Sequence, residues 1–152
     1  MKIKRLICML LVCATMICGS FTPAGAVQAP AGDIIWMEDM EWDLLDPSTV
    51  IYDGTAPLTT GSVNTDISPF STKAISQISL KSGDALTFNC SYSPSSASMD
   101  FGVITSTGRF YHINVKEGSI NQAIRISQDG SYAVAIRNNS SQTVRVVGFV
   151  DY

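Results

Sequence analysis

The chain contains very few side chains that could move protons or attack a substrate. His112 is the only histidine among 152 residues, and no serine lies in a Gly-x-Ser-x-Gly nucleophile elbow. A serine hydrolase needs a histidine to transfer the proton, and a thiol protease would have to pair His112 with Cys90. Cys90 lies in an alternating apolar stretch, where we expect a buried hydrophobe. We therefore predict no catalytic residues and a protein that is not an enzyme.

Acidic side chains are the second group that could do chemistry. They are densest over residues 33–46. Two carboxylates about 5 to 10 Å apart could hydrolyse a glycosidic bond. No pattern in the sequence places two acids across a cleft, and the chain is short for a substrate groove. A small hydrolase is therefore the weakest of the functional alternatives.

Carboxylate oxygens make calcium the metal with most support in the sequence. Asp39, Glu41 and Asp43 are weak candidate ligands, because Ca²⁺ prefers oxygen donors. The sequence has no Asp-x-Asp-x-Asp-Gly loop, so a solvated acidic surface is the preferred interpretation. Zinc is disfavoured, because one histidine and one buried cysteine cannot supply its usual ligands. We expect no cofactor, with calcium as the alternative.

Aromatic side chains could form a binding surface. Trp36, Trp42 and Tyr111 are candidate ligand-binding residues, because an exposed flat ring can stack on the face of a sugar ring. His112 is a further candidate, and strand alternation places it on the face opposite Tyr111. Large aromatic residues dominate small cores, so we expect at least one of the two tryptophans to be buried.

The first 26 residues have the order of a secretory signal peptide. Three basic residues near the start precede an apolar run of 13 residues over 6–18, and small residues follow at 24–26. The apolar run is too short to span a bilayer, which needs about 20 residues. We therefore predict a signal peptide over residues 1–26, cleavage after Ala26, and a secreted or cell-surface protein without a membrane span after processing.

Removal of this leader changes the charge and the cysteine content. Seven basic and thirteen acidic residues remain, so the mature chain carries a net charge of −6. Nucleic acid and anionic membrane surfaces are poor partners for such an acidic protein. Cys90 is the only remaining cysteine, so no disulfide can form within the mature chain and the core alone must stabilise the fold.

Seven short strands are predicted between residues 73 and 152. Apolar and polar residues alternate there, and turn signals recur at a spacing of about ten residues, which indicates an all-β, antiparallel two-sheet sandwich of jelly-roll-like form. Gly102 and Gly148 lie inside strands and predict bulges or close backbone approach. We expect the acidic segment 27–72 to pack on this core. Within it, residues 33–46 fit either a strand or a helix, and we favour an extended conformation.

Three stretches of this region resemble a known family. They cover residues 78–92, 99–111 and 126–138, and they contain a Gly-Asp pair after the first strand and a Gly-x-Tyr pattern in the last stretch. Their order resembles the β-sandwich module of pre-peptidase C-terminal type found in secreted bacterial proteins. The resemblance implies a bacterial source and an accessory or binding role, with calcium or polymer binding in some relatives.

These features favour an exported, non-enzymatic β-sandwich that binds a cell-surface or extracellular polymer such as carbohydrate. The alternative is a structural or self-associating envelope or interaction protein. Tyr152 lies within one residue of the last predicted strand, which would leave that strand as an exposed edge able to pair with another chain.

Overall fold

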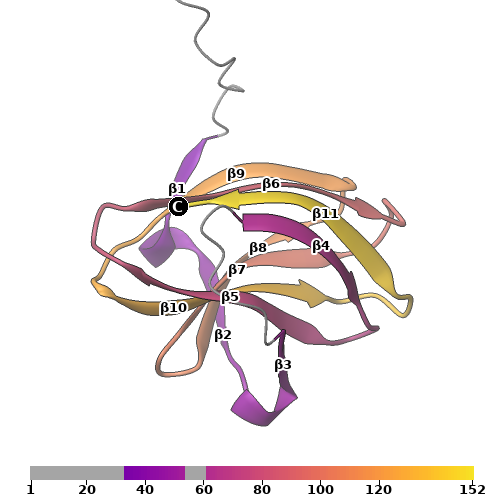
Figure 1. The fold of residues 1–152 in the computed structure, drawn as a ribbon, viewed down its shortest axis with the longest axis horizontal. Coiled ribbons are helices and arrows are strands. Elements are labelled where there is room, and N and C mark those ends of the chain that lie inside the picture. Colours follow the sequence, from indigo (N-terminus) through magenta and orange to yellow (C-terminus); the bar gives the residue numbers. More distant parts are fainter. Residues whose placement is uncertain (1–32, 54–60) are drawn as a thin grey trace, which may run out of the picture.

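Two β-sheets stacked face to face make up the protein (Figure 1). The computed structural model describes residues 33–53 and 61–152, and within these residues it contains eleven strands, two short 3-10 turns and no α-helix. One sheet has the strand order β1-β9-β6-β11-β4 and the other β2-β8-β7-β10-β5-β3. The prediction of an all-β sandwich is confirmed. The strands are β1 (Ile34–Trp36), β2 (Glu41–Leu44), β3 (Val50–Tyr52), β4 (Gly61–Ile67), β5 (Thr72–Leu80), β6 (Ala85–Ser93), β7 (Met99–Thr105), β8 (Arg109–Val115), β9 (Ser119–Arg125), β10 (Gly130–Asn138) and β11 (Val144–Asp151).

The seven strands predicted between residues 73 and 152 correspond to β5 through β11. All pairings among β4 to β11 are antiparallel, as the short turns require. The pairings of β1 with β9 and of β3 with β5 are parallel, so both sheets are mixed. The predicted signal peptide, residues 1–26, lies outside the described residues. No helix in the described part of the chain is long and apolar enough to cross a membrane.

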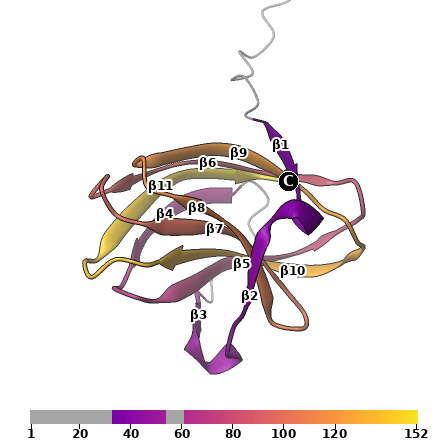
Figure 2. The ribbon, with the colours of Figure 1, turned by 180° about the vertical axis from the view of Figure 1, so that it is seen from behind.

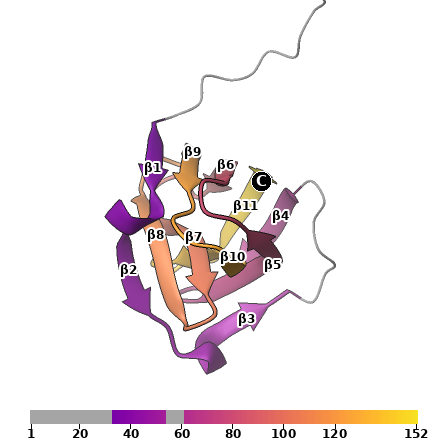
Figure 3. The ribbon, with the colours of Figure 1, turned by 90° about the vertical axis from the view of Figure 1, so that its left-hand side faces the viewer.

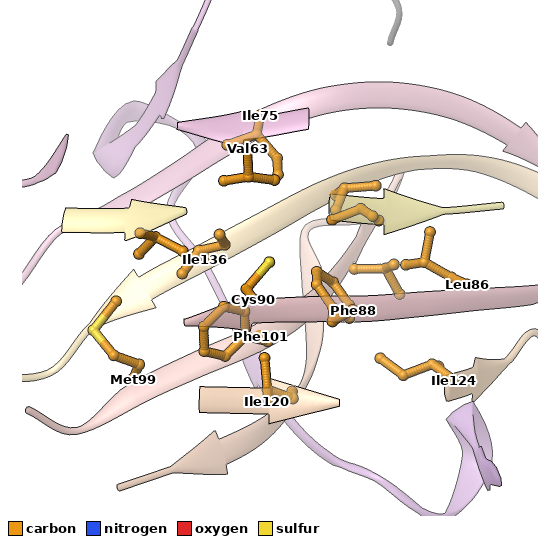
Figure 4. Close-up of a cluster of buried hydrophobic side chains, with 14 of the residues drawn as sticks. Val63, Ile75, Leu86, Phe88, Cys90, Met99, Phe101, Ile120, Ile124 and Ile136 are labelled. Atoms are coloured by element: carbon orange, nitrogen blue, oxygen red, sulfur yellow. The ribbon is translucent and has the colours of Figure 1, made fainter. Parts of the chain in front are cut away.

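Alternating residues of both sheets fill the space between them (Figure 4). Phe88 on β6 and Phe101 on β7 are fully buried, and their rings meet edge to face at 5.7 Å. Burial of a side chain of this size stabilises the fold by roughly 1.5 to 3 kcal/mol. Cys90 lies in the same core with 3% of its surface exposed, as predicted. Burial raises the pKa of its thiol to about 11.

The N-terminal segment, defined here as residues 33–53, contributes strands to both sheets. Figure 2 shows β1 in one layer, a 3-10 turn at Met37–Asp39, and β2 continuing into the other layer. The preference for an extended conformation over residues 33–46 is thus confirmed for β1 and β2. A second 3-10 turn at Pro47–Thr49 then leads to β3, and Asp46 caps this turn by accepting a hydrogen bond from the Ser48 amide at 2.9 Å.

This segment supplies both edge strands of the six-stranded sheet. β2 pairs with β8 on one edge and β3 pairs with β5 on the other, and the chain between them crosses the outer face of the sheet (Figure 3). A second apolar cluster lies on that outer face, and Leu45 of the crossing chain packs against it. The cluster consists of Val50, Ala74, Ile104, Phe110, Ala133 and Ala135.

The last strand is not an edge strand, so the prediction of a free edge at β11 is wrong. β11 lies between β6 and β4 and pairs with both along most of its length. The neighbour that covers it is β4, a strand over residues 61–67 that was not predicted from the sequence. The edges of the two sheets are β1 and β4, and β2 and β3.

Gly102 on β7 is required by close backbone approach, as predicted. It lies opposite His112 on β8, and a Cβ at this position would overlap the carbonyl oxygen of Tyr111. Gly148 on β11 has a φ of 151°, and a Cβ there would overlap the carbonyl oxygen of Asn89. Both glycines allow neighbouring strands to approach where a side chain would separate them.

Candidate functional site

A polar cleft of about 650 Å³ lies on the outer face of the six-stranded sheet, beside the second apolar cluster. Strand alternation brings its side chains to this face. Arg137 on β10, Asp100 on β7 and Asn114 on β8 are register partners in one row, and His112 lies in the next row. The lining residues are Met40, Glu41, Trp42, Asp43, Asp100, His112, Asn114, Arg137 and Asn139.

Asp100 is the buried centre of the cleft, with 1% of its surface exposed. Its Oδ2 accepts hydrogen bonds from Nε of Arg137 and from Nδ2 of Asn139, each at 2.7 Å. Its Oδ1 accepts a hydrogen bond from Nδ2 of Asn114 at 2.6 Å. A buried carboxylate is tolerated only when it is paired and hydrogen-bonded in this way. Asp100 therefore orients the three side chains that surround it.

Arg137 connects this centre to the N-terminal segment. Its Nη2 lies 2.7 Å from Oδ2 of Asp43 on β2 and 2.7 Å from Oδ2 of Asp100. The hydrogen bond from Arg137 lowers the pKa of Asp43 below its ordinary value, with desolvation opposing it and the positive charge of Arg137 adding to it. Burial lowers the pKa of the Arg137 guanidinium, but the hydrogen bonds that it donates to Asp43 and Asp100 outweigh this effect, and the pKa is raised.

His112 lies beside this ion pair with 8% of its surface exposed. Its Nε2 is 3.2 Å from Oδ2 of Asp43 and 3.3 Å from Nη2 of Arg137, and its ring packs on Phe110 with centroids 5.1 Å apart. Its Nδ1 is buried and has no hydrogen-bond partner, although Oδ1 of Asp100 lies 3.8 Å away.

The chemistry available to this arrangement is recognition through hydrogen bonds. No serine, threonine or cysteine is among the described residues that line the cleft, so His112 has no neighbouring nucleophile to activate there. Arg137 pairs with Asp43 and lowers the pKa of that carboxyl, which makes Asp43 a poor proton donor. The cleft instead presents several oriented polar groups side by side.

A second hollow, the end pocket, has a volume of about 530 Å³ and lies where β2, the β7–β8 turn and the β9–β10 loop meet. Arg109, Tyr111 and Tyr132 line it. Trp42 stands at its rim, with its ring centroid 6.5 Å from that of Tyr111 and 4.7 Å from Cζ of Arg109. The hydroxyl of Tyr132 donates a hydrogen bond to the carbonyl oxygen of Gln128 at 2.7 Å. Burial raises the pKa of this tyrosine.

The structure distributes the four predicted binding residues over three places. His112 and Trp42 line the polar cleft, and Tyr111 lines the end pocket. Trp36 lies on β1 of the other sheet, where Cζ of Arg125 is 5.5 Å from its ring centroid. The expectation of a buried tryptophan is wrong, because Trp36 and Trp42 lie on short edge strands and are 42% and 50% exposed. Phenylalanines fill the core in their place.

The three calcium candidates do not form a cage. Glu41 and Asp43 line the polar cleft, whereas Asp39 does not. Asp43 is engaged by the guanidinium of Arg137, whose positive charge would compete with a bound cation. Within residues 33–53 and 61–152, no group of three or more histidine, cysteine, aspartate or glutamate side chains is placed to hold a metal ion.

Four polar residues of the cleft were not identified from the sequence: Asp100, Asn114, Arg137 and Asn139. Alternation with the apolar neighbours of Asp100 and Arg137 places both on an outer face, and that signal was available. It does not show which strands are neighbours. No family model matches the chain and no curated protein matches it, so the resemblance to the pre-peptidase C-terminal module stays a prediction.

Proposed function

We propose that the protein is an exported, non-enzymatic β-sandwich that binds a neutral glycan of the cell surface or the extracellular medium in its polar cleft. The observation that carries this proposal is the oriented set of planar hydrogen-bonding side chains around Asp100. Export rests on the predicted signal peptide. The family resemblance independently favours a binding role over a catalytic one.

The orientation of these groups before any ligand arrives supports tight recognition. Strands β7, β8 and β10 and the loop after β10 contribute to the set, and contacts of 2.6 to 2.7 Å link Asp100 to Arg137, Asn114 and Asn139. Groups that are already held in place lose little conformational entropy when a ligand binds. Little of the free energy of binding is therefore lost to ordering the side chains of the cleft.

Two exposed amides give the cleft the mixed hydrogen-bonding capacity that sugar hydroxyls need. Asn114 and Asn139 are both exposed, and each donates one N–H to the buried Asp100. The Asn114 amide also donates to Oγ of Ser98 at 3.0 Å, so it offers its carbonyl oxygen, whereas Asn139 offers both a second N–H and a carbonyl oxygen. A sugar hydroxyl is both a donor and an acceptor, so it can pair with both sides of the Asn139 amide. Trp42 lines the cleft from the edge strand β2, and its half-exposed ring adds an apolar surface beyond that edge, on the side of its register partner Tyr111.

The charge of the cleft favours a neutral ligand over an anionic one. Glu41, Asp43 and Asp100 are acidic, whereas Arg137 is the one arginine or lysine among the described lining residues. The mature chain also has a predicted net charge of −6. An anionic polymer would meet repulsion both at the cleft and over the whole protein. We therefore assign a neutral glycan as the ligand class.

The test is a binding screen with the purified mature protein. Neutral and uronic-acid oligosaccharides are compared by calorimetry, and the best ligand is then measured against Asn114→Ala, Asn139→Ala and the control Asn89→Ala on the opposite sheet. We expect binding to neutral members only, with affinity reduced about tenfold in the two cleft variants and unchanged in the control. Binding to no glycan, preference for acidic glycans, or full affinity in both cleft variants would overturn the proposal.

A further inference from the structure

We propose that the end pocket is a second glycan subsite, so that one linear neutral glycan contacts the protein on both sides of the edge strand β2. This inference rests on the proposed function and adds to it a second contact region and a preference for chains over single sugars. The two hollows have no lining residue in common.

Strand β2 is the narrow element that separates the two hollows. Asp43 points to the polar cleft and its neighbour Leu44 lines the end pocket, because successive residues of a strand face opposite sides. Trp42 lines the cleft, and its ring contacts Arg109 and Tyr111 of the end pocket. β2 is only four residues long and is an edge strand (Figure 3). A chain that crosses this edge would pass over the exposed tryptophan ring.

The end pocket is held in shape by hydrogen bonds in the loops around it. Oδ1 of Asp129 accepts a hydrogen bond from the backbone N–H of Ser82 at 2.7 Å, which ties the β9–β10 loop to the β5–β6 turn. In the β7–β8 turn, Oγ1 of Thr105 accepts a hydrogen bond from the backbone N–H of Arg109 at 3.2 Å and lies 2.9 Å from Oγ1 of Thr107. A preformed pocket of about 530 Å³ is large enough for a mono- or disaccharide.

The lining of the end pocket offers both stacking surfaces and unused hydrogen bonds. The guanidinium of Arg109 lies over Trp42 and, within the described part of the chain, makes no ion pair with a carboxylate. Its N–H groups are therefore available to sugar hydroxyls. Oγ of Ser127 is buried at the pocket and has no hydrogen-bond partner. Glu38 and Asp129 outnumber Arg109, so this hollow also favours a neutral ligand.

Occupation of both hollows by one chain has a measurable consequence. When the first subsite holds a chain, the second binding event becomes intramolecular, and the overall affinity exceeds that of either subsite. Affinity should therefore increase with the length of the oligosaccharide until the chain spans both hollows. If only the polar cleft binds, affinity should stop increasing with oligosaccharide length once the chain fills that cleft.

The experiment is a length series of the neutral oligosaccharide identified by the screen, measured by calorimetry on the mature protein. Four forms are compared: wild type, Asn139→Ala in the cleft, and Arg109→Gln and Gln128→Ala in the end pocket. Gln128 is an exposed loop residue, so its truncation leaves the fold intact. We expect wild-type affinity to rise at least about tenfold with chain length, and each end-pocket variant to lose most of that rise.

The outcomes separate this inference from the proposed function. If Asn139→Ala weakens binding while both end-pocket variants keep the full wild-type length dependence, the second subsite is wrong and the cleft proposal stands. If no variant changes binding, or no oligosaccharide binds, both are wrong. Loss of the length dependence in the end-pocket variants, with short-chain binding at the cleft retained, supports the inference.

Discussion

Arg137 on β10 donates a hydrogen bond to Asp43 on β2 at 2.7 Å across a separation of 94 residues. The same nitrogen, Nη2, also contacts the buried Asp100. One guanidinium thus joins the N-terminal segment to the centre of the six-stranded sheet and completes the polar cleft. The position of β2 and the geometry of the cleft consequently depend on the same contacts.

Replacement of the buried carboxylate should destabilise the whole domain. In Asp100→Asn, Arg137 loses its buried ionic partner and Asn114 and Asn139 lose a charged acceptor. Removal of one partner of a buried ion pair costs about 3 to 5 kcal/mol, and we expect about 3 kcal/mol here because the Arg137 side chain is 20% exposed. Urea denaturation followed by circular dichroism measures this loss.

An exposed ion pair provides the matched control for that variant. Asp66 on β4 and Arg145 on β11 have side chains that are 58% and 56% exposed. Asp66→Asn should therefore change the free energy of unfolding by no more than about 0.5 kcal/mol. Equal losses of unfolding free energy in the two variants would show that Asp100 contributes no more to stability than an exposed carboxylate.

The ion pair of Asp43 should make stability depend on pH in the acid range. The pKa of Asp43 is lowered below the ordinary value of 3.8, chiefly by the hydrogen bond from Arg137. The ion pair of Asp43 stabilises the fold at pH values above that ordinary pKa, and this stabilisation is lost as the pH falls through the lower pKa of the folded state. The variant Asp43→Asn has no titratable group at this position, so it has no such stabilisation to lose. The stability difference between wild type and variant should shrink as the pH falls below about 4, and a difference that stays constant would contradict the ion pair.

Strands β7 and β8 lie so close together at Gly102 that one added methyl group should strongly destabilise the fold. In Gly102→Ala the new Cβ would overlap the carbonyl oxygen of Tyr111, and the strands beside His112 would have to separate. We expect a loss of about 3 kcal/mol or more in the free energy of unfolding. The control is Gly83→Ala, where φ is 93° but no atom lies within 4 Å, and the expected cost is about 1 to 2 kcal/mol. Equal costs would contradict the close approach at Gly102.

The thiol of Cys90 should be unreactive in the folded protein. Its pKa is raised to about 11 by burial, and the thiolate is the reactive form. With a thiol reagent at about pH 8, we expect no appreciable labelling of the native protein and complete labelling in urea. Rapid labelling without denaturant would mean that the core around β6 opens to solvent.

Much of the sandwich was predictable because its strands carry a local signal. The alternation through Phe88 and Cys90, or through Phe101 and Val103, identifies a strand and its buried face without knowledge of its neighbours. β4 lacks that signal, since its segment is mostly polar, and the error about the edge at β11 followed from it. β1 to β3 are each only three or four residues long and are stabilised by pairing rather than by their own pattern.

The candidate site was predictable only in part, because it depends on which strands are neighbours. The sequence places His112 on the face opposite Tyr111, and the structure agrees. No local pattern relates Asp43 to Arg137, whose contact requires β2 to pair with β8 and β8 to lie two strands from β10. The exposure of the tryptophans likewise follows from their position on edge strands and not from their residue type.

Binding of a neutral glycan in the polar cleft can be tested by a chemical-shift map of the ¹⁵N-labelled mature protein titrated with a neutral oligosaccharide. We expect saturable shifts of the side-chain amides of Asn114 and Asn139 and of the indole N–H of Trp42. Shifts confined to the five-stranded sheet, around the exposed Trp36 of β1 and the exposed Phe149 of β11, would contradict binding in the cleft, as would the absence of saturable shifts with any neutral oligosaccharide.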